Sequence, residues 1–382
     1  MSAKRLLADA SGSVADLGVL LPIAAALILI NGLDAATVLV GVGTLYLAAG
    51  FYFRVPVPVQ PIKAAAAIAI ARELPPETIG AAAITLGAVL VILGATGATR
   101  FISRAFSTPI VRGLQLGVGL ILTKTAFTLA GGASNSGGLL VAAAIAIVLT
   151  LGSRWRETVP LAVLVVVGAA IYGAVTGDGT SSIGFGLWAP HLNTGAFNVS
   201  VLMSAITLLV IPQIPLTLGN AVVAVVDLEH RYFPLSSRKV NPAAISISSG
   251  VANITVGALG GMPMCHGSGG LTAHYRAGAE TYRMNVVIGG FFLACGLFAG
   301  PSALALFQVI PAPVLAGFLA FTGLFHSSLA TELRGFDLVV AVCIGLLGLL
   351  TTNRAIGLAV GLLLYWPHRY AADRHSPAKA NA

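Results

Sequence analysis

The chain has 382 residues, of which 57% are hydrophobic and only 9% are charged, and its mean hydropathy is +0.93. This composition excludes an ordinary soluble domain and places the chain in a lipid bilayer. The formal net charge of +8 could indicate nucleic-acid binding, but basic residues of a membrane protein collect in loops that stay in the cytoplasm. We therefore expect an integral membrane protein that contacts lipid and binds no nucleic acid.

Apolar windows of about 20 residues, enough to cross a bilayer, recur from Leu17 nearly to the C-terminus. The first seven predicted segments cover 15–31, 35–53, 57–71, 78–98, 108–129, 138–152 and 159–176. The next seven cover 200–227, 240–259, 262–277, 284–307, 311–330, 336–350 and 354–367. The predicted fold is thus all-α, with fourteen transmembrane segments. Residues 1–13 are interpreted as a polar end, and no additional soluble domain is expected.

The two sets of seven segments carry an internal repeat. Pro58 and Pro263 are 205 positions apart, and three further residues recur 204 positions later, as Pro109/Pro313, Gly113/Gly317 and Gly119/Gly323. Because each half has an odd number of segments, the second copy enters the membrane from the opposite side, which makes the repeat inverted. The predicted organisation is a first repeat at 1–176, an extracellular or periplasmic linker at 177–199, a second repeat at 200–367 and a cytoplasmic tail at 368–382.

The distribution of Lys and Arg predicts the orientation. If both termini are cytoplasmic, seventeen of the twenty-one Lys and Arg residues lie inside, as the positive-inside rule requires. Only Arg72 and Arg354 lie outside, while Lys63 and Lys124 fall within predicted segments, where a charge is costly and usually functional or paired. A bacterial plasma membrane is the expected location.

Two short proline-interrupted stretches, 55–71 and 261–278, break the apolar pattern at matching points of the two halves. Each is expected to hold extended backbone around Pro58 or Pro263 that leads into a short helix. Extended backbone at membrane depth survives only inside protein or beside a water-filled cavity. Paired discontinuous segments of this kind are typical of a transporter's binding site.

The chemistry of these breaks suits an anion. Lys63 lies in the first turn of the first half-helix, where unpaired backbone N–H groups and the helix dipole already attract negative charge. The second break offers N–H groups of a glycine-rich turn and the Ser268 hydroxyl. The alternatives are that Lys63 pairs with a carboxylate and that the glycines only permit close helix packing. The candidate substrate-binding residues here are Gln60, Pro61, Lys63, Cys265, His266, Gly267, Ser268 and Gly269.

The first segment of the second half adds three polar candidates. Gln213 and Thr217 are four residues apart and Thr217 and Asn220 three, so they share one helical face. This face is expected to contact substrate or, alternatively, to bond neighbouring helices together. For a coupling ion the intramembrane candidates are Asp16, His266 and His326, and transport without coupling remains an alternative.

Three segments closely resemble signature motifs of the molybdate transporter family, the compact branch of the sulfate permease superfamily. They are 57–63 (VPVQPIK), 212–220 (PQIPLTLGN) and 261–270 (GMPMCHGSGG), and Asp16-Leu17-Gly18 with Pro22 matches the family's first-segment pattern. The resemblance implies a seven-plus-seven inverted repeat with a core domain, formed by segments one to four of each half, and a gate domain, formed by segments five to seven. It also implies a tetrahedral dianion, molybdate or sulfate, bound between the two half-helices.

Other functional classes fit less well. A nucleobase permease of the same fold would be expected to place a carboxylate in one of the breaks, and neither break contains one. An anion channel would conduct without alternating access. Cys265, Cys295 and Cys343 are widely spaced, with no spacing suited to zinc, so no disulfide, metal or cofactor is expected, and no nucleophile-base set indicates an enzyme. The sequence leaves the oligomeric state open, a homodimer being one arrangement.

Overall fold

The computed structural model describes residues 3–104, 106–156, 159–176, 184–302, 305, 309–351 and 354–374. The first half holds α1 (Ala3–Ser13), α2 (Leu17–Leu29), α3 (Ala35–Phe53), α4 (Lys63–Ala71), α5 (Pro76–Ala95), α6 (Ala98–Arg104), α7 (Thr108–Leu129), α8 (Ser136–Gly152) and α9 (Leu161–Thr176). The second half holds α10 (Val199–Ala205), α11 (Ile211–Leu216), α12 (Ala224–Tyr232), α13 (Pro242–Ala258), α14 (Ser268–Arg276), α15 (Arg283–Ala299), α17 (Ala312–Ser328), α18 (Gly335–Leu350) and α19 (Arg354–Arg374). The fold is therefore nearly all helical in the described residues.

Each of the fourteen predicted segments contains a helix. Among the described residues, seven helical runs are long and apolar enough to cross a membrane, and three shorter apolar helices accompany them. The half-helices α4 and α14 have nine residues each, so each is about 14 Å long. That is under half of the roughly 30 Å hydrocarbon core, as expected for discontinuous segments.

Both predicted polar ends need correction. Residues of the N-terminal end form α1, which joins α2 in one apolar run, Lys4–Leu29. This end is ordered because the Asp9 carboxylate, fully buried, accepts hydrogen bonds from the backbone N–H groups of Glu280 and Thr281. At the other end α19 extends to Arg374, beyond the predicted limit at residue 367.

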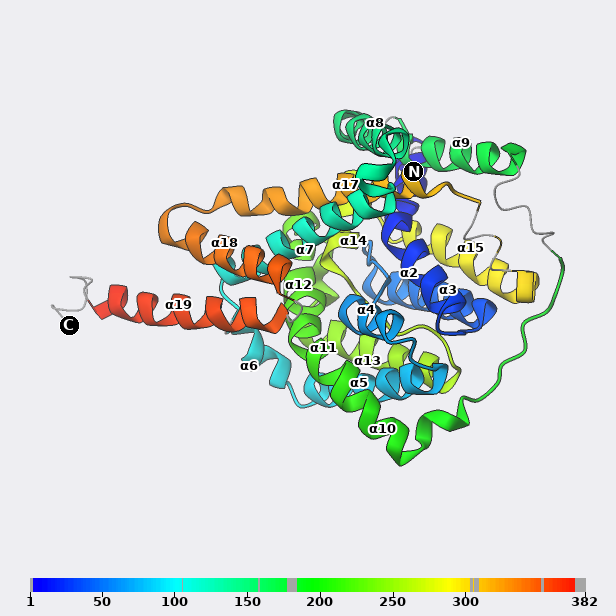
Figure 1. Cartoon of the computed structure of the whole chain (residues 1–382). Coiled ribbons are helices and arrows are strands. Elements are labelled where there is room, and N and C mark those ends of the chain that lie inside the picture. The colour runs from blue at the N-terminus through cyan, green and yellow to red at the C-terminus, as the bar shows by residue number, and fades with distance from the viewer. Residues whose placement is uncertain are drawn as a thin grey trace.

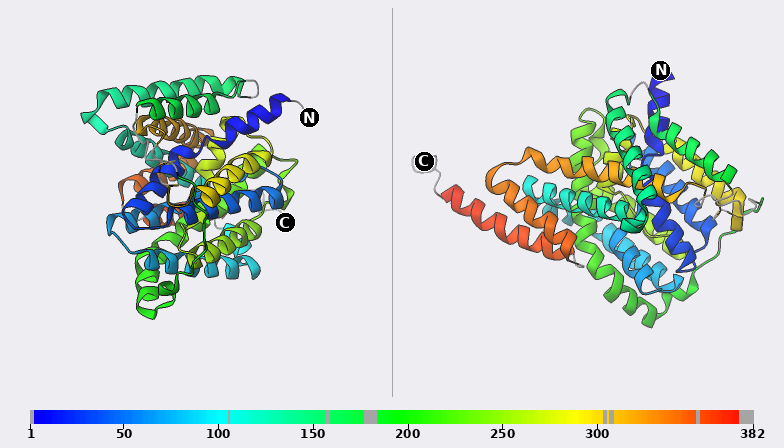
Figure 2. Two further views of the ribbon diagram at one scale, coloured as in Figure 1. Left: turned by 90° about the vertical axis from the view of Figure 1, so that its right-hand side faces the viewer. Right: turned by 45° about the horizontal axis from the view of Figure 1, so that its top comes forward.

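The helices gather into two groups (Figures 1 and 2). In one group α3 packs along α15 and α5 along α13; in the other, α7 packs on α17 and α18, and α8 on α17. Figure 1 shows α17, α18 and α19 on one side of the molecule and α2, α3 and α15 on the other, with α10–α12 descending between them. We call the group containing α2–α5 and α10–α15 the core and the group containing α7–α9 and α17–α19 the gate.

Glycines set the distance between the crossing helices. Gly87 on α5 and Gly250 on α13 face each other's backbone, because a Cβ on either would lie 2.6–2.7 Å from the other's carbonyl oxygen. Gly119 on α7 and Gly323 on α17 are arranged in the same way. Small residues at crossings let backbones approach closely, which is how helices associate without a hydrophobic driving force in lipid.

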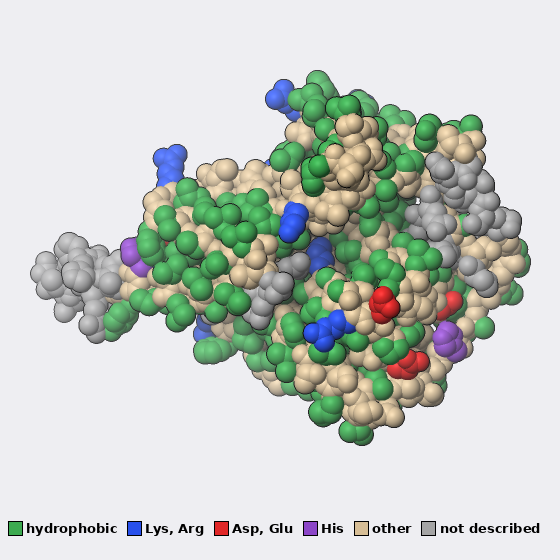
Figure 3. Space-filling view, in the orientation of Figure 1, with side chains coloured by type: hydrophobic (Ala, Val, Ile, Leu, Met, Phe, Trp, Pro, Cys, Tyr) green, Lys and Arg blue, Asp and Glu red, His purple; other side chains and the backbone are tan. Residues whose placement is uncertain are grey.

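The outer surface suits a bilayer. Figure 3 shows one face covered mostly by hydrophobic side chains with a few isolated basic ones. Many large apolar side chains are exposed, Val175 at 81% and Leu140 at 71% among them. Exposure of so much apolar surface would be unfavourable in water but suits contact with lipid. The Lys124 side chain is also exposed, on α7, so its charge reaches the surface as snorkelling lysines do.

The tight crossing at Gly119 is testable by thermal unfolding in detergent. In Gly119→Ala the added Cβ would lie 2.7 Å from the carbonyl oxygen of Gly323, which should lower the free energy of unfolding by about 1–3 kcal/mol. Gly290→Ala is the matched control, because nothing lies within 4 Å of its Cβ position; it should be neutral or stabilise by about 0.5–1 kcal/mol. Equal unfolding temperatures for the two variants would contradict this packing.

Candidate functional site

The two breaks meet in the middle of the core as a short antiparallel pair. Strand β1 (Gln60–Pro61) pairs with β2 (Met264–Cys265), Gln60 opposite Cys265 and Pro61 opposite Met264. The Ile62 N–H donates to the Pro263 carbonyl at 3.1 Å. This pairing fixes the starts of α4 and α14 beside one another, because each helix begins within three residues of its strand.

Two asparagines complete the hydrogen bonding of the extended backbone. Asn285 on α15 accepts from the Val57 N–H at 3.0 Å and donates to the Val57 carbonyl at 2.7 Å. Asn253 on α13 accepts from the Met264 N–H at 2.9 Å and donates to the Met264 carbonyl at 2.6 Å. Each amide thus substitutes for a neighbouring strand, which satisfies backbone groups that lipid could not.

A chain of polar side chains links the first helix of the core to the first half-helix. The Asp16 carboxylate accepts from Gln60 Nε2, 2.7 Å from both oxygens, and Gln60 Oε1 accepts from Lys63 Nζ at 2.6 Å. Asp16 and Gln60 are buried. Gln60 therefore joins a carboxylate to an ammonium group through its side-chain amide.

Glycines of the second break make room for this chain. A Cβ on Gly267 would overlap Gln60 Oε1, and one on Gly270 would lie 2.6 Å from Asp16 Oδ2. Both glycines are thus required for the close approach of the Gln60 amide to the start of α14. Gly269 instead faces the gate, where its Cβ would contact Leu122 on α7 at 3.3 Å.

The polar face predicted around Gln213 lies at the start of α4. Gln213 Oε1 accepts from the Ala65 N–H at 3.0 Å, and Gln213 Nε2 donates to Thr217 Oγ1 at 2.9 Å. The amide thereby caps one of the N–H groups that a helix start leaves unpaired. Thr217 opens a π-helical stretch, Thr217–Val223 (η5), that follows Pro215; such wide turns arise where the regular helical bonding is interrupted and are frequent at functional sites.

A second polar cluster lies at the start of α14. Ser268 Oγ donates to Asn220 Oδ1 and lies 3.1 Å from His326 Nε2 on α17, while His326 Nδ1 lies 2.9 Å from Thr272 Oγ1. All four side chains are buried. The core and the gate therefore share a hydrogen-bond network at this half-helix.

His266, predicted as a substrate-binding and coupling residue, has both ring nitrogens hydrogen-bonded within the core. Its Nδ1 lies 2.9 Å from the Pro58 carbonyl oxygen and its Nε2 lies 3.0 Å from Ser248 Oγ. Both ring nitrogens are therefore engaged within the core, where the imidazole stabilises the first break. The adjacent Cys265 contributes backbone to β2 and a buried thiol. Among the described residues, no group of three or more His, Cys, Asp or Glu side chains could hold a metal ion.

Sequence reasoning missed the residues that support the site. Asn253, Asn285 and Ser248 lie in otherwise apolar helices, and a polar side chain in such a helix signals that it has a partner. The sequence does not say which partner, because Asn285 bonds to a residue 228 positions away.

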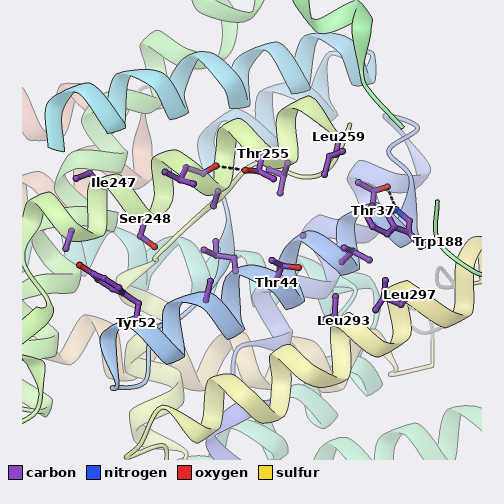
Figure 4. A pocket seen from close by; sticks show the side chains of 18 residues that line it. Thr37, Thr44, Tyr52, Trp188, Ile247, Ser248, Thr255, Leu259, Leu293 and Leu297 are labelled. Carbon is purple, nitrogen blue, oxygen red and sulfur yellow. Dashed lines mark hydrogen bonds between the residues drawn. The ribbon is translucent and has the colours of Figure 1, made fainter. Parts of the chain in front are cut away.

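One large cavity in the core does not suit an anion. It has a volume of about 700 Å³ and lies between α3, α13 and α15, with mostly apolar walls. Figure 4 shows Thr37 and Trp188, which share a hydrogen bond, at one end and Tyr52 with Ser248 at the other. An oxyanion would lose its hydration there without gaining enough donors, so the half-helix starts remain the candidate site.

Solved structures share this fold. The chain resembles the transmembrane domain of a cyanobacterial bicarbonate transporter, BicA, with a TM-score of 0.59 over 96% of this chain and 98% of that one, at 16% identity. It also resembles the murine solute carrier 26 family member A9 anion transporter in its inward-facing state, with a TM-score of 0.63, covering 96% of this chain and 68% of that one at 14% identity. At such identities the likeness concerns the fold.

Sequence comparison assigns the family. Residues 8–122 and 205–325 match the family described as "Molybdate transporter of MFS superfamily", and these ranges include both breaks. Molybdate transporter 2 of Arabidopsis thaliana is 30% identical, covering 94% of this chain and 87% of the plant protein. The chain is an integral membrane protein that belongs to the molybdate transporter family.

Proposed function

We propose that this protein is a secondary transporter of a tetrahedral oxyanion, molybdate first, which binds between the starts of α4 and α14. The observation that carries the proposal is the β1–β2 pairing, which sets two half-helix N-termini and Lys63 side by side within the core. Backbone N–H groups and helix dipoles at such termini favour anions. Relatives that bear the name molybdate transporter support the choice of cargo.

The charges of the site fit a dianion that arrives with one cation. Each helix terminus contributes about half a positive charge, and Lys63 adds a full one, which together balance a dianion. Asp16, joined to Lys63 through Gln60, adds a negative charge when ionised and leaves the filled site about one charge negative. Inclusion of Asp16 in the charge balance therefore favours entry of one proton or other monovalent cation with the anion.

An inverted repeat explains which residues meet. In a two-fold arrangement, equivalent residues on the axis face each other. Gln60 pairs with Cys265, 205 positions later, and Gly119 packs on Gly323, 204 positions later, which are the two separations found in the sequence repeat. The helix pairs follow the same symmetry. In the repeat α3 corresponds to α13 and α5 to α15, and α3 packs on α15 as α13 packs on α5. Likewise α7 corresponds to α17 and α8 to α18, and α8 packs on α17 as α18 packs on α7. These pairings support fourteen segments in a seven-plus-seven repeat.

Alternating access then follows from movement of the core against the gate. The core carries the breaks with their internal hydrogen bonds, so it would move as one unit, while α7 and α17 of the gate line its front at Gly269 and Ser268. We further propose a bacterial plasma membrane and cytoplasmic termini, on the basis of the Lys and Arg distribution.

Binding of molybdate and sulfate to the purified protein tests the site. By calorimetry at fixed salt, Lys63→Ala should weaken molybdate binding about 10- to 100-fold, because it removes a charge-assisted hydrogen bond worth about 1.5–3 kcal/mol. Lys124→Ala is the matched control, since that lysine is exposed on the surface of α7, and it should bind normally. Equal affinity for the two anions would make the protein a sulfate-class carrier, and no binding of either by folded wild type would refute the oxyanion proposal.

The role of Gly267 can be tested by transport into proteoliposomes. Gly267→Ala should reduce molybdate uptake at least tenfold, because its methyl group would displace the Gln60 side chain and with it the contacts to Asp16 and Lys63. Gly168→Ala, with nothing within 4 Å of its Cβ position, should transport normally. Wild-type uptake by folded Gly267→Ala would show that the Gln60 position does not matter for transport.

A further inference from the structure

His326 differs from the other buried histidines in the partners of its ring. His266 and His274 each have one ring nitrogen against a backbone carbonyl, of Pro58 and Gly12 respectively. His326 has a hydroxyl on each side, Ser268 at Nε2 and Thr272 at Nδ1. A hydroxyl can donate or accept, whereas a carbonyl only accepts. The surroundings of His326 can therefore serve both of its protonation states.

The network accommodates one added proton without leaving a polar atom unsatisfied. Because Ser268 donates its hydrogen to Asn220 Oδ1, the neutral ring must donate from Nε2 to Ser268 and accept from Thr272 at Nδ1. In the charged ring Nδ1–H donates to Thr272, whose own hydrogen turns away. Every group keeps a partner in both states, which removes the usual cost of a buried unpaired group.

A path leads from this ring toward the surface. The Tyr232 hydroxyl lies 3.5 Å from Thr272 Oγ1, at the limit of a hydrogen bond, and the Tyr232 side chain is partly exposed. A proton received by the Tyr232 oxygen displaces the phenolic proton onto Thr272, and the Thr272 proton passes to His326 Nδ1. Each oxygen gains one proton and loses one, so only His326 changes its charge.

We propose that His326 is the proton-binding site that couples the oxyanion to a proton, with Thr272 and Tyr232 as its relay. This inference rests on the proposed function and deepens it. His326 belongs to the gate helix α17, while its hydroxyl partners belong to the core half-helix α14. Movement of the core against the gate breaks and remakes these contacts, so the proton affinity of the ring changes with access. Asp16, by contrast, is bonded to the core residue Gln60.

Charges around α17 explain why anion and proton bind together. The His326 ring is hydrogen-bonded to Ser268 at the start of α14, so a dianion bound there attracts the charge of a protonated ring. By linkage the proton strengthens anion binding to the same extent. The other charged or titratable side chains on described elements packed against α17 are Asp16 before α2, Arg112 and Lys124 on α7, Tyr172 on α9, His274, Tyr275 and Arg276 on α14, and Glu332 in the 3-10 turn Leu329–Glu332.

Proteoliposomes holding a pH-sensitive dye and purified protein test the inference. In the wild type, molybdate uptake should acidify the lumen, and an inward proton gradient should raise molybdate accumulation about tenfold. In His326→Gln both effects should disappear, while exchange of internal for external molybdate, which needs no net proton movement, should persist and report a folded carrier. Thr272→Val, which removes only the hydroxyl at Nδ1, should also lose the acidification. His230→Gln, a partly exposed histidine on α12, is the matched control and should behave as wild type.

The outcomes separate the two proposals. Wild-type molybdate transport without acidification would overturn proton coupling and leave the transporter proposal standing. Acidification that survives in His326→Gln but is lost in Asp16→Asn would move the proton to Asp16 and overturn the assignment to His326. Absence of any molybdate transport by folded wild type would overturn both. If His326→Gln loses exchange as well, Thr272→Val decides, since full acidification in that variant contradicts the relay.

Discussion

The structure depends on how two stretches of extended backbone are satisfied in an apolar interior. A peptide group without a partner is expensive at membrane depth, and each break contains several. Prolines have no backbone N–H to satisfy, and the β1–β2 pairing satisfies other backbone groups. The Asn285 amide bonds to both the N–H and the carbonyl of Val57, and the Asn253 amide does the same for Met264. These contacts come from helices far apart in sequence, so the breaks can exist only once the core has assembled.

The same requirement creates the candidate site. A break that is held in place leaves the next helix starting inside the protein, with N–H groups that have no intrahelical partner. The molecule satisfies one of them with Gln213 at α4 and places Lys63 beside the rest. The cost of interrupting a membrane helix is thereby offset by contacts made elsewhere in the core, and the N–H groups that stay unpaired are those that the proposed anion site would use.

Two kinds of helix contact divide the molecule. Within the core, and within the gate, glycines bring backbones together, as Gly87 does with Gly250 and Gly119 with Gly323. Between core and gate at α14 the contacts are hydrogen bonds of Ser268 and Thr272 with His326. Close backbone packing resists sliding, whereas hydrogen bonds between hydroxyl groups and an imidazole can be exchanged at small cost. The contrast holds at α14 and not along the whole boundary, because a Cβ on Gly18 of the core helix α2 would lie 2.6 Å from the Leu315 carbonyl oxygen of the gate helix α17.

The amino-acid sequence by itself determined the membrane class, the position of a helix in every predicted segment and the two breaks, because hydropathy and proline act locally. It also determined the family, since VPVQPIK and GMPMCHGSGG are contiguous motifs. It did not reveal that residues 3–13 continue the first helix, since the hydrogen-bond partners of Asp9, Glu280 and Thr281, lie 271 and 272 residues away along the chain. Only the tertiary structure decided that His266 bonds within the core while His326 reaches the half-helix. The two histidines lie in similarly apolar surroundings, and the direction of a buried side chain is set by the helices packed around it.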